Sequence, residues 1–166
     1  LKKGVLSTQG YAAMIASTTR LNTPGKALSE LNDVHALTDV TGFGLAGHLL
    51  EMCRGSNLDA QIDFAQIPVI TEALHWAQQG TRTGATERNW SGYGAEVQLP
   101  NNAPDWIKTL ITDPQTSGGL LIACAPKAEA AVHALLSTHG FLDAKTIGHL
   151  QARTDTTLAR LRVIPA

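Results

Sequence analysis

Residues 38–44 read Thr38-Asp39-Val40-Thr41-Gly42-Phe43-Gly44 and stand between two apolar patterns. The pattern before them predicts a strand over 34–37, and Leu45, Leu49 and Met52 after them recur at helical spacing. Glycines at 42 and 44 allow a sharp turn, which would direct main-chain N–H groups and the positive end of the helix outward. Thr41, Gly42 and Gly44 would then form the phosphate side of a loop, and Asp39 could hold a divalent cation that bridges phosphate oxygens. The same residues also fit a tight connection in which Asp39 is only a cap.

Two further segments carry polar groups that could contact an anion. Asp113-Pro114-Gln115-Thr116-Ser117-Gly118-Gly119 opens as a turn, and its two glycines permit the close approach of another backbone. Its Thr116 and Ser117 could bind phosphate or only satisfy the loop's own backbone. Thr86-Glu87-Arg88-Asn89 offers an arginine that could clamp an anion in two-pronged fashion or form an ordinary salt bridge.

Helices and strands alternate irregularly along the chain, which predicts an α+β fold. Apolar periodicity and capping residues predict helices over 9–19, 24–31, 45–54, 71–79, 105–111 and 126–139. Strands are predicted over 34–37, 58–62, 120–124, 145–150 and 158–164, with 120–124 as a central strand. Tyr11, Met14 and Ile15 are expected on the buried side of the first helix, and residues 81–104 as one long ordered loop. No shift in composition divides residues 1–166, so we expect a single domain.

Composition excludes several classes of protein. Thirteen basic and fourteen acidic side chains give a net charge of −1, which offers no basic field for nucleic acid or an anionic membrane. The longest apolar run, 120–125, is too short to span a bilayer. Two cysteines do not form a disulfide scaffold, so we expect a reduced, cytoplasmic protein. Charged residues make up only 16%, and the chain begins at Leu1, so we expect a piece of a larger protein that another domain partly covers.

The histidines and cysteines predict no catalytic residue in this chain. None of the six histidines lies at metal-ligand spacing from another histidine or a cysteine. His48 and Glu51 lie three residues apart on one predicted helix and could touch. Cys53 and Cys124 fall in apolar patterns and are interpreted as core residues.

Two long segments in the right order resemble the selenophosphate synthetase (selenide, water dikinase) family. They are Thr38-Asp39-Val40-Thr41-Gly42-Phe43-Gly44-Leu45-Ala46-Gly47-His48 and Asp113-Pro114-Gln115-Thr116-Ser117-Gly118-Gly119-Leu120-Leu121. Residues 1–6, Glu87-Arg88-Asn89 and Ile147-Gly148 fit as well. The resemblance runs from about residue 1 to 152 and concerns the carboxy-terminal half of those enzymes, a half shared with aminoimidazole ribonucleotide synthetase.

The resemblance implies a layered α/β/α domain of the α+β class and a role in making selenophosphate. Such enzymes use selenide, ATP and water, release AMP and phosphate, and require Mg²⁺. The position of Asp39 implies a Mg²⁺ ligand, whose companion carboxylates come from the amino-terminal half. That half also supplies a catalytic cysteine or selenocysteine, a catalytic lysine, most of the ATP pocket and the interface of a homodimer. Neither Cys53 nor Cys124 matches the active-site cysteine, so we expect this chain alone to be inactive.

Two alternatives remain open from the residues. The chain could be a stand-alone binding or interaction module with the same fold. It could also belong to a related ATP-dependent enzyme that acts on another acceptor.

Overall fold

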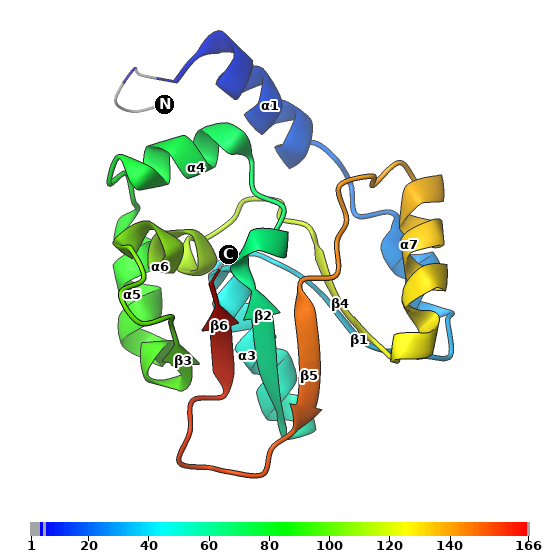
Figure 1. Ribbon diagram of the computed structural model, residues 1–166. Helices are drawn as coiled ribbons and strands as arrows, with labels where there is room; N and C mark the ends of the chain where they lie inside the picture. The colour runs from blue at the N-terminus through cyan, green and yellow to red at the C-terminus, as the bar shows by residue number, and fades with distance from the viewer. Residues whose placement is uncertain (1–3, 5, 166) are drawn as a thin grey trace.

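Four strands form the larger of two sheets in the computed structural model, which describes residue 4 and residues 6–165 (Figure 1). They lie in the order β3 (Val97–Gln98), β6 (Leu161–Ile164), β2 (Leu58–Asp63) and β5 (Gly148–Ala152). β2 is antiparallel to β5 and parallel to β6, which is parallel to β3. Helix α3 (Gly44–Ser56) packs against this sheet, and its Leu49 and Leu50 share one core with Ile62 and Leu161.

The second sheet is a two-stranded antiparallel ribbon of β1 (Val34–Asp39) and β4 (Leu120–Cys124). Successive β4 side chains face opposite sides: Leu121 joins the core under α3, whereas Leu120 and Ile122 pack against a second core. That second core is built on α2 (Pro24–Ser29) and α7 (Glu129–Thr138). The prediction of a central strand at 120–124 was therefore wrong. Both faces of β4 are apolar because the ribbon separates two cores, not because strands flank it on both edges.

The remaining helices complete an α+β arrangement of sheets flanked by helices, as predicted. They are α1 (Thr8–Thr18), α4 (Thr71–Gln78), α5 (Gly84–Tyr93) and α6 (Asp105–Thr112). Short 3₁₀ turns occupy Phe64–Gln66, Gly94–Glu96 and Pro126–Ala128. No helix in the part of the chain that the structure describes is long and apolar enough to cross a membrane.

Residues 81–104 do not form the long loop that was predicted. They contain α5, the Gly94–Glu96 turn and β3. The helix was missed because its sequence, which contains two glycines and single Thr, Asn and Ser residues, has weak helix propensity and no apolar stripe. Contacts with the rest of the molecule hold it instead, since Thr86 and Tyr93 are buried and the Thr83 hydroxyl accepts a hydrogen bond from the Thr86 N–H.

Helix α1 lies where a helix was predicted, but its apolar side chains do not face a core. Tyr11 is 47% exposed and Ile15 40% exposed, and Gly10 is the buried residue of this helix. In Figure 1 the helix lies at the edge of the molecule, beside α4. The last two strands also begin later than predicted, at Gly148 and Leu161.

The register of the ribbon depends on a close approach between Gly118 and the Val40 carbonyl. A Cβ at position 118 would lie 2.0 Å from the Val40 oxygen, whereas a Cβ at Gly119 would meet nothing within 4 Å. We expect Gly118→Ala to lower the free energy of unfolding by about 2–3 kcal/mol, because backbone must move to admit the methyl group. Gly119→Ala, the matched control, should change it by less than about 1 kcal/mol. Urea denaturation measures both, and equal effects would contradict this account of the ribbon.

Candidate functional site

The structure brings together the three segments that the sequence singled out. β1 ends at Asp39 and pairs there with Leu120, the first residue of β4, so the segments 39–44 and 113–119 leave the ribbon at the same end. The Val40 N–H extends the pairing by donating to the Gly119 carbonyl. Residues 83–93 of α5 and its cap lie against both segments. We call these three segments, residues 39–44, 83–93 and 113–119, the loop cluster.

One carbonyl joins the first two segments. The Thr41 oxygen accepts hydrogen bonds from the N–H groups of Gly44 at 3.1 Å and Gln115 at 3.0 Å. Gly44 has φ +68°, a left-handed conformation that favours glycine, and a Cβ there would press on the backbone of Thr112 and Asp113. The turn into α3 is thus fixed both by its own conformation and by contact with the end of α6.

Asp113 and Asn89 connect the third segment to the other two. The Asp113 carboxylate accepts hydrogen bonds from the hydroxyls of Thr86 at 2.8 Å and Thr83 at 3.1 Å. The Asn89 side-chain amide donates to the carbonyls of Gly42 and Thr112, each at 2.9 Å. These contacts assign Asp113 and Asn89 structural roles within the loop cluster.

Tyr93 completes the connections of α5 and was not anticipated from the sequence. Its hydroxyl donates to the Phe43 carbonyl, and burial raises the pKa of Tyr93 to about 12. The phenol therefore stays protonated and remains a donor at physiological pH. A lone tyrosine in a segment without periodicity gave no signal that could have revealed this contact.

The predicted site residues differ in exposure. Asp39 and Gly42 are exposed, Thr41 is half-buried, and Gly44 is buried against α6. Thr116, Ser117 and Arg88 are exposed too. No group of three or more His, Cys, Asp or Glu side chains that could hold a metal ion occurs among residues 4 and 6–165. Asp39 therefore offers one carboxylate at an open surface rather than a complete metal site.

His48 lies beneath the first segment of the loop cluster. Its side chain is buried on α3, with Nε2 3.1 Å from the Thr41 hydroxyl oxygen. Nδ1 lies 2.9 Å from a carboxylate oxygen of Glu51, which confirms the predicted contact one turn along the helix.

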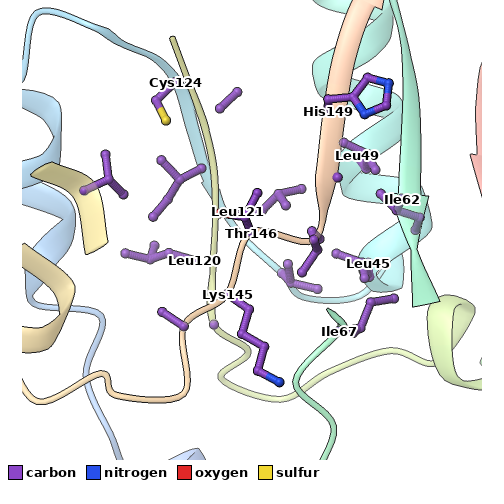
Figure 2. Close-up of a pocket in the computed structure, with 18 of the residues that line it drawn as sticks. Leu45, Leu49, Ile62, Ile67, Leu120, Leu121, Cys124, Lys145, Thr146 and His149 are labelled. Atoms are coloured by element: carbon purple, nitrogen blue, oxygen red, sulfur yellow. The ribbon is translucent and has the colours of Figure 1, made fainter. Parts of the chain in front are cut away.

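An apolar cavity of about 600 Å³ lies beside the loop cluster, between β4, β5 and α3 (Figure 2). Leu45, Leu49, Ile62 and Leu121 are among the side chains that line it. Polar groups such as Lys145, Thr146 and His149 belong to the segment that leads into β5 and to β5 itself. The lining is mainly aliphatic, and Gln115, Glu129 and His133 add to its polar side chains.

The sequence was then compared with known proteins. Residues 12–160 match the family described as AIR synthase related protein, C-terminal domain. The chain belongs to this family. It is 53% identical over 150 residues to a selenide, water dikinase of Paraburkholderia xenovorans, a match that covers 90% of this chain and 42% of that protein. It is 49% identical over 160 residues to the selenide, water dikinase of Burkholderia pseudomallei, covering 95% of this chain and 45% of that one.

The chain thus spans less than half the length of these relatives. Among solved structures it is similar to the hydrogenase maturation protein HypE in complex with ATP, at 21% identity and a TM-score of 0.49 over 85% of this chain and 35% of that one.

The cysteines of this AIR synthase related domain have the packing roles that were predicted. Both are free; Cys53 is buried in the core under α3, and Cys124 packs against the second core. Burial raises the pKa of Cys53 to about 11 and raises that of Cys124 as well. Neither thiol therefore ionises readily near neutral pH, so neither has the thiolate character of a nucleophile.

Asn89 allows a direct test of how the loop cluster is held together. Asn89→Asp keeps the shape of the side chain but replaces an amide donor by a carboxylate that faces the Gly42 and Thr112 carbonyls. We expect the free energy of unfolding to fall by about 1–3 kcal/mol, since the carbonyl of the buried Thr112 and that of the exposed Gly42 both lose their donor. Asn101→Asp, at an exposed turn, is the control and should change it little. Equal urea midpoints for the two variants would show that Asn89 does not join the segments.

Proposed function

We propose that this chain is the carboxy-terminal domain of a selenide, water dikinase, an enzyme that makes selenophosphate from selenide, ATP and water and releases AMP and phosphate. The observation that carries the proposal is the convergence of three polar segments around Asp39 in a chain about half identical to selenide, water dikinases. In this proposal residues 1–166 form one domain, and the amino-terminal domain of the same enzyme is its first partner.

The chemistry of Asp39 fits a Mg²⁺ ion shared between two domains. A carboxylate oxygen is the hard ligand that Mg²⁺ prefers, and Asp39 is exposed at the end of β1 beside the exposed Gly42. Because the described residues offer no second and third carboxylate nearby, the companion ligands would come from the amino-terminal domain. When bound, Mg²⁺ would neutralise the negative charge that builds up on the phosphates as they are transferred.

The loop cluster itself would orient and enclose the polyphosphate. Asp39 and Gly42 are both exposed, and a Cβ at Gly42 would meet nothing within 4 Å among the described residues other than its chain neighbours. A phosphate can therefore approach this backbone closely. Asp39 would complete the ion's ligand shell only when the domains close, so that closure excludes water from the transferred group. Gly44 is already explained by its positive φ and its contact with the end of α6. Its contribution to the site would be to set the turn into α3.

The proposed partners follow from the same assignment. They are ATP and selenide, the amino-terminal domain, and a second copy of the enzyme in a homodimer; nucleic acid and membranes are not among them. We place the enzyme in the cytoplasm, in keeping with two free cysteines. A stand-alone binding module would bind its ligand without any second domain, and a relative with another acceptor would form AMP without selenide.

Asp39→Asn in the complete enzyme tests the metal assignment. The change keeps the size of the side chain and removes its charge, so we expect most of the selenide-dependent AMP formation to be lost. The melting temperature should stay within about a degree of the parent's. An exposed carboxylate whose companion metal ligands lie in another domain contributes little to the stability of this fold. Asp143→Asn, at another exposed position, is the control and should retain activity. Normal activity with a loss of about 0.5–2 kcal/mol of stability would instead identify Asp39 as a cap.

The chain by itself should fold but not turn over ATP. In this proposal the catalytic cysteine and lysine belong to the amino-terminal domain, and both thiols of this chain are packed into cores. We expect no AMP above background from the 166-residue protein given ATP, Mg²⁺ and selenide, with the complete enzyme as the positive control. Sustained AMP release from the isolated chain would refute its assignment as a half-enzyme.

A further inference from the structure

His48 contacts a polar side chain with each of its ring nitrogens, although its side chain is only 10% exposed. Nε2 lies 3.1 Å from the Thr41 hydroxyl, and Nδ1 lies 2.9 Å from an oxygen of Glu51. The second contact is close in distance but does not have the geometry of a hydrogen bond, so Nδ1 and the Glu51 carboxylate interact through their charges and dipoles. The Phe43 ring, 5.7 Å away between centroids, covers the imidazole.

These contacts determine where a neutral imidazole carries its proton. A lone pair on Nδ1 would face the Glu51 carboxylate at 2.9 Å and be repelled, whereas an N–H there is attracted. The proton is thus held on Nδ1, which leaves Nε2 as an acceptor. The Thr41 hydroxyl must then donate its hydrogen to Nε2.

We propose that His48 is a positioning residue: Glu51 fixes the proton of His48 on Nδ1, and His48 Nε2 in turn holds the hydroxyl of Thr41, two residues after Asp39, as a pure acceptor. The effect on turnover rests on the proposed function, but the state of the imidazole does not. Thr41 is already held by its main chain, because its carbonyl accepts from Gly44 and Gln115. The contact with His48 also restricts the rotation of the Thr41 side chain.

A hydroxyl that already donates its hydrogen can interact with a further group only as an acceptor, so that group must be a hydrogen-bond donor. A phosphate oxygen, which carries only lone pairs, would be repelled by the lone pairs of Thr41. A water molecule bound to a divalent cation is a strong donor and would be attracted. The structure therefore assigns the Thr41 hydroxyl to the water shell of a cation at Asp39, and leaves the phosphate to the backbone of the loop.

The first test observes the imidazole directly. Long-range ¹H–¹⁵N correlation spectra of the 166-residue protein distinguish the two neutral tautomers and the imidazolium. We expect His48 to be the Nδ1–H tautomer, and expect Glu51→Ala to release it toward a mixture. An Nε2–H tautomer or an imidazolium in the parent protein would overturn the proposal, because either would donate to Thr41.

The second test uses kinetics in the complete enzyme. Thr41→Val removes the hydroxyl at constant shape, and we expect the Mg²⁺ concentration at half-maximal rate to rise about tenfold, the usual effect of losing a group that contacts a metal's ligands. Thr41→Ser restores the hydroxyl and should lie within about twofold of the parent. Glu51→Ala should give part of the rise, and should add nothing when Thr41→Val is already present. Additive effects, or a Mg²⁺ requirement unchanged in Thr41→Val, would overturn the proposal.

A second group of threonine, histidine and glutamate side chains, on α7 and in the segment before β5, serves as a control outside the loop cluster, and in this group the threonine contacts the carboxylate directly. The Thr146 hydroxyl lies 3.0 Å from Nε2 of His133 and donates to the Glu129 carboxylate at 2.5 Å, at the exposed side of α7. Glu129→Ala and Thr146→Val should leave the Mg²⁺ requirement unchanged, and a rise as large as that of Thr41→Val would show an unspecific effect and count against the proposal. If Asp39→Asn stays active while the Nδ1–H tautomer is found, the assignment of Asp39 to a cation fails and the role of Thr41 toward that cation fails with it, whereas the positioning of the Thr41 hydroxyl by His48 stands.

Discussion

The contact between the backbone at Val40 and the backbone at Gly118 and Gly119 is the constraint on which the rest of the molecule depends. It continues the pairing of β1 and β4 beyond the last strand residues, and it needs a glycine because the Val40 carbonyl occupies the space of a Cβ. Once these two segments meet there, the Thr41 carbonyl is close enough to accept a hydrogen bond from the Gln115 N–H as well as from the Gly44 N–H. The start of α3 and the exit of the second segment are thereby fixed by the same few atoms.

The ribbon also explains how a small domain supports a polar surface at one end. β4 sends Leu121 into the core beneath the larger sheet and its neighbours into the core beside α7, so neither core can shift without moving the ribbon. The segments that carry Asp39 and Gly118 therefore project from a ribbon packed between the two cores. Thr86 and Asn89 of α5 donate hydrogen bonds to both segments and connect them to a third part of the chain.

The sequence predicted those parts of the fold whose signals are local. The strand, turn and helix around Asp39, the apolar β4 and the helix after Pro126 follow from periodicity and from glycine and proline chemistry over a few residues. α5 could not be predicted, because its stability comes from Thr86, Asn89 and Tyr93 meeting partners distant in sequence. The exposure of Tyr11 and Ile15 on α1 was also missed. Their helical spacing predicts an apolar face, but it does not show whether another element packs against that face. The three polar segments were each recognised, but only tertiary structure could bring them together, and the role of His48 depends on both of its neighbours at once.

The way α1 is attached gives the molecule a sensitivity to acid at that edge. The hydroxyl and N–H of Ser7, which caps the helix, donate to the Glu72 carboxylate of α4, and these bonds hold the pKa of Glu72 below its usual range. A depressed pKa means that the attachment is complete above the ordinary pKa of a glutamate and is lost as the pH falls through the lower value. At the far end of the segment, Arg20 contacts the Gly140 carbonyl and stacks 3.8 Å over the Phe141 ring, and neither contact depends on a carboxylate. Acidification therefore weakens the attachment of α1 at Ser7, whereas the contacts of Arg20 do not titrate with a carboxylate.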